Sequence, residues 1–513
     1  MKILRLCVIL LISSLFCSTS CEANKMSNAD IREPAVAGRF YPDSPVKLKS
    51  AILQFLQDAI PAKLKKPVAI VVPHAGYIFS GQICADGFKQ VSHEKYDVVV
   101  ILGTNHTNSG FQKISLYPGS GFRTPLGTAP IDRSIVSALV KEDPADCALD
   151  TSLHESEHSV EVMVPFIQVI FPEAKIVPAV VGSPDTQMCA RFGRALAKVL
   201  KNRRALIVAS SDLSHYPSAE NANFVDRETL AAVAKLDPGI FQATVKSQAK
   251  RSIPNLHTSV CGEAPVLATM AAAEALGAVR GVVVSYANSG DLSVGDRSRV
   301  VGYGAIVFTA EAQYEGIPAA KSSQKATSAS GELTPADKKA LLAFARKTLS
   351  GIFATTTVPL ARGFDARLQQ PRGVFVTLRK KGDLRGCIGR MVADEPLVKL
   401  VGIMSLQAAF NDRRFPQLTA DELKDIEIEI SVLTPMKQVA GADKIVVGRD
   451  GVLLTKDDHS AVFLPQVATE QGWNREQMLD HLCLKAGLTT GSWKKGAKFS
   501  TFQAIVFSES QFK

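Results

Sequence analysis

Short segments made almost entirely of branched or apolar residues recur through the first part of the chain, at 68–73, 98–103, 175–181, 205–210 and 281–286. Helical stretches lie between several of them, for example Gln187–Lys201 and Ala264–Leu276. Near-continuous Val and Ile strands that alternate with helices are typical of a mostly parallel sheet with helices on both faces. The sequence therefore predicts an α/β fold for this part of the chain.

Three of the predicted strands are followed, within a few residues of their carboxyl ends, by a histidine: His74, His106 and His215. In sheets of this kind the carboxyl ends of the strands form the ligand site. One such histidine is usually a hydrogen-bonded loop residue, but three at equivalent ends of one sheet indicate a metal site or an acid–base centre. Asp212, close to His215 in the sequence, is a candidate to orient or charge that imidazole.

A cysteine is the fourth candidate. Cys261 heads an apolar helical run, and the N-terminus of a helix favours the thiolate form of a cysteine. A thiolate together with imidazoles suits borderline metals, so we expect Fe(II), zinc or copper. Two alternatives remain open. One is a His-and-carboxylate site that uses Asp212 or Glu263, and the other is a metal-free enzyme in which Cys261 attacks and His215 activates it.

The segment HESEH, from His154 to His158, matches the letters of the zinc-protease motif H-E-x-x-H. In a metalloprotease this motif lies within an amphipathic helix, whereas here it is polar throughout and the apolar run begins only after it. We therefore expect a solvated helix start, or acids that line the neighbouring site.

The chain begins with a segment that we interpret as a leader outside the fold. Residues 1–23 combine Lys2 and Arg5 with an apolar run and then small residues, the order found in secretory signals. The run is shorter than the roughly 20 apolar residues that cross a membrane. We expect an exported, periplasmic protein, or a lipoprotein whose only membrane attachment is a lipid on Cys21. If this interpretation is wrong, the protein is cytoplasmic.

A second boundary divides the rest of the chain. Residues 311–332 lack apolar periodicity and are rich in Ala, Ser and Lys, as flexible linkers are. Thr334 then offers a helix N-cap, followed by Pro335. We expect a first domain at 32–310 and a second at 333–513. The net charge of +10 lies in scattered Lys and Arg pairs, so there is no strong nucleic-acid signal.

Separated motifs follow one another through the first domain: REPAVAGRFYP, VVPHAGYIFSG, LGTNH, HESEHSVE, SSDLSHY and the Cys-Gly pair at 261–262. Together they resemble the Memo family, whose fold is similar to that of class III extradiol dioxygenases. The resemblance implies that His74, His106 and Cys261 are the metal-site residues, with Asp212 and His215 the polar pair beside them. Iron is favoured over copper or zinc. True extradiol dioxygenases bind iron with two histidines and a carboxylate, so a cysteine ligand sets this chain apart.

The second domain mixes strands and helices without strict alternation, which predicts an α+β fold. Its motifs are GVFVTLRKKGDLRGCIGRM, FNDRRFPQLTADEL, IEIEISVLTP, VFLPQVATEQGW and HLCLKAGL. Together they resemble an AMMECR domain, smaller than the first domain.

A turn is expected at LRGCIG, where Arg385 and Cys387 stand with Gly386 and Gly389. Such a turn could bring backbone amides close to an anion, and the alternative is a tight turn around a buried cysteine. The same cleft would be lined by Asn411, Asp412 and Arg413.

Both resemblances in one chain indicate a fusion of two parts of the AmmeMemoRadiSam system. This implies a functional link to a radical-SAM protein, which would be a separate partner because no C-x-x-x-C-x-x-C motif is present. Three functions follow. The first is a redox or dioxygenase-like metalloenzyme with His215 as its acid–base group. The second is a metal-carrying or peptide-binding module without turnover. The third is the thiol enzyme. The substrate would be an unidentified small molecule or peptide.

Overall fold

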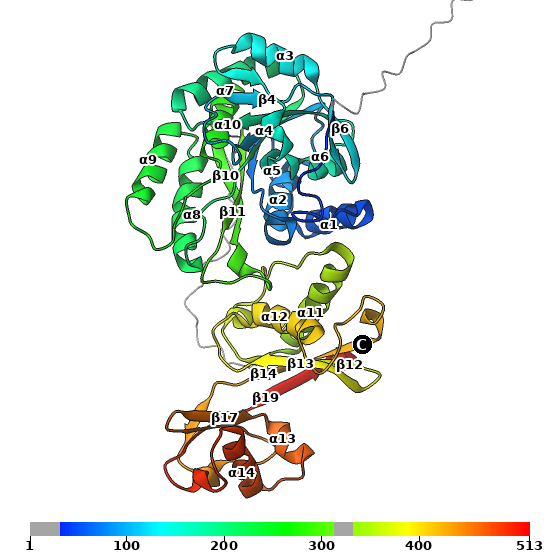
Figure 1. Cartoon of the computed structure of the whole chain (residues 1–513), viewed down its shortest axis with the longest axis vertical. Coiled ribbons are helices and arrows are strands. Elements are labelled where there is room, and N and C mark those ends of the chain that lie inside the picture. Colours follow the sequence, from blue (N-terminus) through cyan, green and yellow to red (C-terminus); the bar gives the residue numbers. More distant parts are fainter. Residues whose placement is uncertain (1–30, 312–331, 513) are drawn as a thin grey trace, which may run out of the picture.

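The computed structural model describes residues 31–311 and 332–512, which form two bodies stacked along the long axis of the molecule (Figure 1). The expected leader at 1–23 lies outside the described residues, as does the expected linker apart from its end residues 311 and 332. Within the described ranges, none of the helices is both long and apolar enough to cross a membrane.

The first body is built on an eight-stranded sheet in the order β10-β11-β2-β9-β3-β8-β4-β7. The strands of this sheet are β2 (Pro67–Val72), β3 (Val98–Thr104), β4 (Ile114–Leu116), β7 (Cys147–Leu149), β8 (Lys175–Val181), β9 (Ala205–Ser210), β10 (Arg280–Asn288) and β11 (Gly302–Thr309). The central strands β2, β9, β3 and β8 are parallel neighbours. The pairings of β11 with β2 and β10, and of β4 with β8, are antiparallel. The predicted α/β fold is confirmed, with a mixed sheet.

Helices cover both faces of this sheet. They are α1 (Pro45–Asp58), α2 (Tyr77–Val91), α3 (Arg133–Glu142), α4 (Ser152–Glu155), α5 (His158–Glu161), α6 (Val164–Ile170), α7 (Thr186–Leu200), α8 (Ala219–Ala234), α9 (Pro238–Ala249) and α10 (Glu263–Ala275). In Figure 1, α1, α2, α5 and α6 lie on one side and α7 to α10 on the other. A small sheet of β1 (Ile31–Arg32), β5 (Gly121–Thr124) and β6 (Gly127–Pro130) flanks the body.

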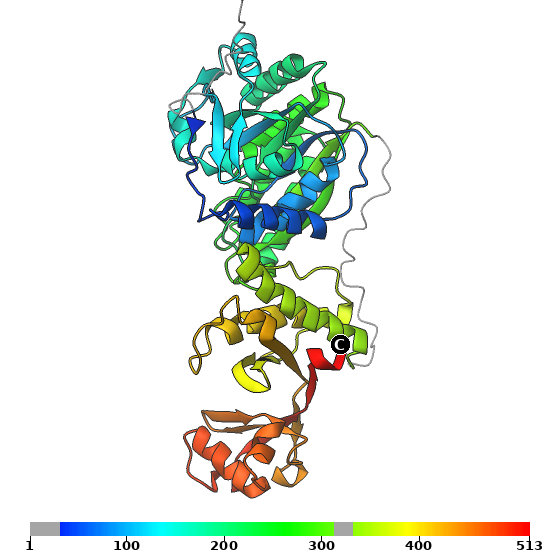
Figure 2. The ribbon, with the colours of Figure 1, turned by 90° about the vertical axis from the view of Figure 1, so that its right-hand side faces the viewer.

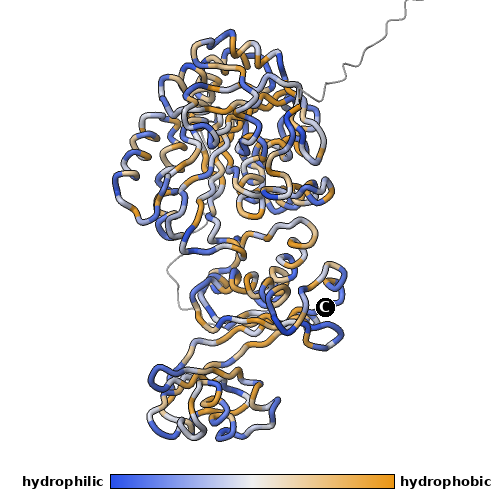
Figure 3. The backbone as a smooth tube through the Cα atoms, in the orientation of Figure 1, coloured by the Kyte–Doolittle hydropathy of each residue, from blue (hydrophilic) through white to orange (hydrophobic). Residues whose placement is uncertain are grey.

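The sheet occupies the apolar core of the first body. Every residue of β3 is buried, which accounts for the uninterrupted apolar run in its sequence. Figure 3 shows the same concentration of hydrophobic residues along the central strands. Each fully buried Val or Ile stabilises the fold by about 1.5–3 kcal/mol. A sheet held in this way gives the strand ends fixed positions, which matters for the residues that follow them.

The second body consists of two lobes with separate apolar cores. The large lobe contains α11 (Pro335–Thr355), α12 (Leu397–Phe410) and a sheet of β12 (Val374–Lys380), β13 (Asp383–Arg390), β14 (Ile426–Leu433) and β19 (Ala504–Ser508). The small lobe contains α13 (Pro465–Glu470), α14 (Arg475–Lys485) and a sheet of β15 (Lys437–Val439), β16 (Gly451–Lys456), β17 (His459–Phe463) and β18 (Lys498–Phe502). All pairings in both sheets are antiparallel, as expected for an α+β fold.

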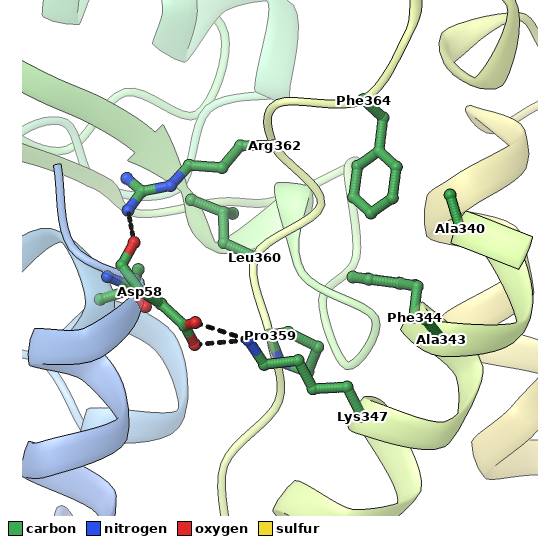
Figure 4. Close-up of a pocket in the computed structure, with 10 residues that line it drawn as sticks. Asp58, Ala340, Ala343, Phe344, Lys347, Pro359, Leu360, Arg362 and Phe364 are labelled. Carbon is green, nitrogen blue, oxygen red and sulfur yellow. Dashed lines mark hydrogen bonds and ion pairs between the residues drawn. The ribbon is translucent and has the colours of Figure 1, made fainter. Parts of the chain in front are cut away.

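The large lobe docks on α1 and α2 of the first body through ion pairs. Arg362 contacts the fully buried carboxylate of Asp86 and donates to the backbone carbonyl of Asp58 at 2.7 Å. Lys347 on α11 reaches both carboxylate oxygens of Asp58 at 2.6 Å. Figure 4 shows the contacts of Arg362 and Lys347 with Asp58, beside a hollow of about 350 Å³ whose lining includes Phe344. The two bodies are therefore joined by side-chain contacts as well as by the chain.

Candidate metal centre

The candidate residues gather at the carboxyl ends of neighbouring strands. His74 stands two residues after β2, His106 two residues after β3, and Asp212 two residues after β9. Because β9 lies between β2 and β3 in the sheet, these ends adjoin one another. Cys261 joins them from the start of α10, where its backbone amide donates to the carbonyl of Asp212 at 3.2 Å. The sheet thus brings together residues that are nearly 190 positions apart in the chain, the separation of His74 from Cys261.

Hydrogen bonds fix the tautomer of His74. Its Nδ1 lies 2.8 Å from the hydroxyl of Ser210, and that hydroxyl donates to the carbonyl of Ser159 at 2.6 Å. Ser210 must therefore accept from Nδ1–H, which leaves the lone pair of His74 on Nε2. Burial lowers the pKa of His74 well below its usual value, so the imidazole is neutral near pH 7. A neutral imidazole with a fixed Nε2 lone pair is the form that binds metals.

Glu157 fixes the tautomer of His106 in a similar way. Its carboxylate accepts from the backbone amide of His106 at 2.7 Å and from the ring Nδ1 at 2.9 Å. Burial opposes ionisation of Glu157, but the His106 hydrogen bond and charge, with the amide of Ser159, outweigh it and lower its pKa to about 2. Since an ionised carboxylate can only accept, Nδ1 of His106 carries the proton and Nε2 is again the donor atom for a ligand.

His158 is a third imidazole at this place. It opens α5, and its ring stacks on that of His106 with the centroids 4.6 Å apart. Its ring centroid is 5.4 Å from that of His74. Gly103 near the end of β3 permits this approach, because a Cβ there would meet the hydroxyl of Ser159 at 2.5 Å. Burial lowers the pKa of His158, which keeps it neutral as well.

The donor atoms fall into two overlapping sets. One contains His74, His106 and His158, the other His74, Asp212 and Cys261, and within each set all donors lie within 4.8 Å of one another. His74 Nε2 is 3.2 Å from Cys261 Sγ and 3.9 Å from an Asp212 oxygen. Neither set combines His106 with Cys261. The expected trio therefore meets only through His74, which belongs to both sets.

The protonation state of Cys261 differs from the thiolate that the sequence suggested. α10 begins at Glu263 with Gly262 as its N-cap, so Cys261 stands just outside the helix. Burial raises the pKa of its thiol well above the usual value, and the nearby Asp212 raises it further. Desolvation thus outweighs any stabilisation of the thiolate by the helix start. Cys261 is therefore a neutral thiol until a cation or a metal ion approaches.

Asp212 and His215 are oriented by backbone groups. Asp212 accepts from the amides of His74 and Ala75, at 2.8 and 3.3 Å, and burial raises its pKa. The ring of His215 donates from Nδ1 to the carbonyl of Leu213 at 2.9 Å, so the lone pair of the neutral ring is on Nε2. The structure thus gives to Leu213 the orienting role that the sequence suggested for Asp212. The alternative carboxylate ligand, Glu263, belongs to neither donor set.

The H-E-x-x-H letters do not form a protease motif. His154 lies in α4 and His158 in α5, two separate four-residue helices. His154 is buried against Ser115, away from both donor sets. Of the two expectations for this segment, the solvated helix start is wrong, and Glu157 is an acid that lines the neighbouring site. Ser210 was not singled out from the sequence, and His158 was named only as part of the H-E-x-x-H letters, without a role at this site.

A buried carboxylate fastens this segment to the start of the fold. Glu161 accepts from Tyr41, from the amides of Ala35 and Val36, and from Arg32. Arg32 also donates to the carbonyl of Glu157 at 2.9 Å. This network, three residues after His158, holds α5 in place beneath the donor atoms, and no sequence pattern had indicated it.

In the second domain, the expected LRGCIG turn is instead part of strand β13. Its glycines serve packing. A Cβ on Gly386 would meet the carbonyl of Ala408 at 2.3 Å, and one on Gly389 would meet the ring of Phe375 at 2.2 Å. Arg385 is paired with Glu422 at 2.9 Å. An anion-binding turn was therefore the wrong interpretation, because the segment runs on as a strand with a register shift at Arg385, and that arginine already has a carboxylate.

The structure brings some of the remaining candidate site residues of this domain together and leaves others apart. Asp412 accepts from the amide of Cys387 at 2.8 Å and from Arg414, whose hydrogen bond lowers the pKa of that carboxyl. The side chains of Asn411 and Arg413 are exposed. Asp412 and Cys387 thus meet as expected, while the arginine beside them is Arg414 and not Arg413.

Comparison with known proteins gives two matches along the chain. A family described as Memo-like protein matches residues 32–307, and one described as AMMECR1 matches residues 342–507. A MEMO1 family protein of Aquifex aeolicus is 40% identical over 279 residues, covering 54% of this chain and 99% of that protein. A MEMO1 family protein of Methanopyrus kandleri is 36% identical over 293 residues, covering 54% and 98%. A crystal structure of an uncharacterized protein from Pyrococcus horikoshii, 33% identical, covers 34% of this chain and 93% of its own, with a TM-score of 0.32.

Proposed function

The chain belongs to the Memo-like protein family and carries an AMMECR1 domain fused behind it, and on this basis we propose that its first domain binds one metal ion around His74. One observation carries the proposal. Nε2 of His74 belongs to both sets of donor atoms and lies 3.2 Å from the sulfur of Cys261. Its Nδ1 is engaged by Ser210, so only Nε2 is left to bind a ligand.

The donors suit a borderline transition metal. His74 and His106 each hold the ring proton on Nδ1 through a partner of their own, the arrangement that orients histidine ligands in metal sites. Cys261 would lose its proton on binding the ion, since a metal lowers the pKa of a coordinating thiol. Imidazole and thiolate ligands favour Fe(II), copper or zinc over magnesium or calcium. Iron is our preferred ion, because Asp212 adds a carboxylate to the imidazoles.

A bound iron ion would supply redox chemistry and a Lewis-acid site. The chain's own residues would hold and move protons beside it. Because Nδ1 of His215 donates to Leu213, the neutral ring has its lone pair on Nε2, and that nitrogen would accept a proton from a substrate and return it. Asp212, whose pKa burial raises, could share a proton with a ligand of the site. This arrangement supports a dioxygenase-like or other redox activity on an unidentified small molecule or peptide.

A metal carrier without turnover is the second candidate. The two sets together contain five donor residues, of which His74 is the buried imidazole that both share: His74, His106, His158, Asp212 and Cys261. Metal sites that use all their positions for protein ligands are closed, whereas catalytic ones keep a position open for substrate. Which of the five bind the ion therefore decides between the two functions.

The metal-free thiol enzyme has less support. A nucleophilic cysteine needs a lowered pKa, whereas burial raises that of Cys261. The imidazole beside its sulfur is that of His74, whose pKa burial lowers, so a thiolate–imidazolium pair is disfavoured on both sides.

The fusion bears on the partner of this protein, and the leader of residues 1–23 bears on its location. We propose that the protein cooperates with a separate radical-SAM protein, and that it is exported, either free in the periplasm or held by a lipid on Cys21. The intact mass of the native protein tests the export proposal, because a retained Met1 would contradict it.

Metal analysis of the full-length chain tests the proposed function. Protein purified without chelator, and a sample reconstituted anaerobically with Fe(II), should hold one ion per chain. Cys261→Ser and His106→Ala should each lose most of it, while His215→Ala should keep the ion and lose reactivity. The matched controls are Cys189→Ser, a buried cysteine of α7, and His93→Ala, an exposed histidine. Full occupancy in both Cys261→Ser and His106→Ala would refute the proposal.

A further inference from the structure

The segment that joins β10 to β11 contacts both the metal centre and the second domain. It comprises residues 289–301, begins with the short 3-10 helix Ser289–Asp291, and is called the bridging segment below. In Figure 2 the large lobe lies between the first body and the small lobe, and the bridging segment is part of the surface that the large lobe contacts. The contacts on its two sides show what it connects.

One side of the bridging segment packs on α12 of the large lobe. Gly402 of α12 comes so close that a Cβ at this position would meet the hydroxyl of Ser293 at 2.1 Å. Ser293 is buried, and its hydroxyl has no hydrogen-bond partner among the described residues. The guanidinium of Arg297 lies 3.6 Å from the carboxylate of Asp291 and 3.9 Å from that of Glu395. The second domain therefore holds the segment through the backbone of α12 and through Glu395.

The two carboxylates beside Arg297 are each fixed by a partner in their own domain. Glu395 is buried, and Lys399 of α12, only 2% exposed, donates to it at 2.8 Å. Asp291 accepts from the amide of Asn288 at 2.9 Å. Because removing one member of a buried ion pair leaves the other charge uncompensated, Glu395 and Lys399 hold each other in place. Arg297 thus lies between two anchored carboxylates, one from each domain.

The other side of the bridging segment runs beside the residues that carry His215. His215 pairs with Val301 in an antiparallel bridge, and the amide of Tyr216 donates to the carbonyl of Val300 at 2.6 Å. Tyr216 has a φ of +75°, which is strained for a bulky side chain, and the guanidinium of Arg299 lies 4.0 Å from the centroid of its ring. Strained backbone persists only where its surroundings hold it. The chain at His215 therefore depends on the bridging segment for its conformation.

Arg297 makes contacts on both sides. Its carbonyl accepts from the amide of Ala219, the first residue of α8, at 2.8 Å, while its side chain reaches Glu395 of the second domain. Packed and hydrogen-bonded groups that contact one another in this way carry coupling between distant sites. None of the five donor residues of the metal centre lies in the bridging segment. A change at this contact should therefore reach His215 and leave the donor residues in place.

We propose that the docked second domain positions His215 through the bridging segment, with Arg297 as a positioning residue. Looser docking would let the strained chain at Tyr216 relax and move the imidazole of His215, so the second domain would regulate proton transfer beside the metal. The inference rests on the proposed function only for that role of His215.

Gly402→Ala in the full-length, metal-free protein tests the proposal. Alanine suits a helix better than glycine, so α12 should remain formed while its new methyl displaces Ser293. The NMR signals of the His215 ring should shift, and hydrogen exchange at the amide of Tyr216 should become at least 10-fold faster. Metal content after reconstitution should equal that of wild type. If wild type binds no metal, the proposed function fails, whereas the His215 signals still report on positioning.

Ser293→Ala supplies the rescue. It removes the hydroxyl that the new methyl would meet, and because that hydroxyl has no hydrogen-bond partner among the described residues, its loss alone should leave the His215 signals unchanged. Combined with Gly402→Ala, it should restore most of the wild-type signals. The methyl would also meet the ring of Phe344 at 2.9 Å, a contact within the large lobe. Absence of rescue would assign the effect to Phe344 and overturn the proposal.

Arg297→Gln approaches the contact from the first body and decides the case if Gly402→Ala does not fold. It should shift the His215 signals in the same direction, and Arg297→Lys, which keeps the charge, should shift them less. Lys347→Ala is the matched control, since it removes a contact between the two bodies that lies outside the bridging segment. Unchanged His215 signals in folded Gly402→Ala or Arg297→Gln, or an equal shift in Lys347→Ala, would overturn the proposal.

Discussion

The carboxylate of Glu157 holds His106 at two points, the backbone amide at 2.7 Å and the ring Nδ1 at 2.9 Å. A single buried group thereby fixes where the imidazole stands and which nitrogen carries its proton. Because Glu157 also caps α5 through the amide of Ser159, the same carboxylate positions His158 next to that ring. Two of the imidazoles around His74 therefore depend on one residue that belongs to neither donor set.

Glu157→Gln should weaken metal binding by roughly 10- to 100-fold, the usual effect of losing the partner of a histidine ligand. The amide keeps the shape of the side chain but no longer imposes the Nδ1–H tautomer on His106. Competition titration of apo protein with a metal chelator measures the affinity. Glu155→Gln, an exposed acid two residues earlier, should have no effect. Equal affinities of the two variants would show that Glu157 does not orient the site.

The buried imidazole of His154 should make the folding stability of the protein sensitive to acid. Burial lowers its pKa from 6.5 to about 4, and its Nδ1 has no hydrogen-bond partner among the described residues. Below pH 6.5 the unfolded chain binds a proton at this residue, whereas the folded protein does not until about pH 4. The contribution of His154 to folding stability should therefore fall by about 3 kcal/mol as the pH drops through this window, and this contribution should stay constant above it.

Urea unfolding at several pH values between 4 and 7.5 checks this prediction in wild type and His154→Gln, which cannot take up the proton. The difference in unfolding free energy between them should shift in favour of the variant as the pH falls. Parallel pH profiles of the two proteins would mean that His154 titrates normally in the fold.

The sequence was sufficient for the framework that carries the site. Strands at 175–181 and 205–210 have the predicted bounds, and the histidines after β2 and β3 do meet, because buried parallel strands leave a local apolar signal. The division of the second domain into two lobes left no such signal. Strands of both lobes alternate alike, and only the pairing of β14 with β19 across the inserted small lobe separates them.

The features of the site that the sequence did not predict were missed for a similar reason. Glu157 and His158 lie in a polar segment that resembles a solvated helix start. In the fold Glu157 is buried and His158 is half-buried, and Arg32 and Tyr41, over 100 positions away, hold the segment in place through Glu161. Cys261 was placed correctly beside His74, but its ionisation depends on burial, which a sequence does not show. The glycines of LRGCIG indicated a turn, whereas tight packing was the actual reason for them.

Gly302→Ala should disturb His215 without touching a donor residue. A Cβ at this position would meet an Asp226 oxygen at 1.9 Å, and Asp226 holds Ser214 through both its amide and its hydroxyl. The clash should cost about 1–3 kcal/mol of stability. Metal content should remain, while the NMR chemical shifts of the His215 ring should change. Loss of metal with an unchanged His215 signal would contradict this assignment of roles.

Arg362→Ala should weaken the contact between the two bodies. Asp86 is fully buried, and removal of the guanidinium leaves its carboxylate without a charged partner, at a cost of about 3–5 kcal/mol. Lys347→Ala is the control, since its pair with Asp58 is 42% exposed on the lysine side and should contribute at most about 1 kcal/mol. Adding Asp86→Asn to Arg362→Ala should restore most of the loss, because the buried charge is then gone. Urea unfolding of the four proteins, with hydrogen exchange on α2 and α11, measures these effects. If the double variant is no more stable than Arg362→Ala, the loss comes from the packing of the arginine and not from the buried carboxylate of Asp86.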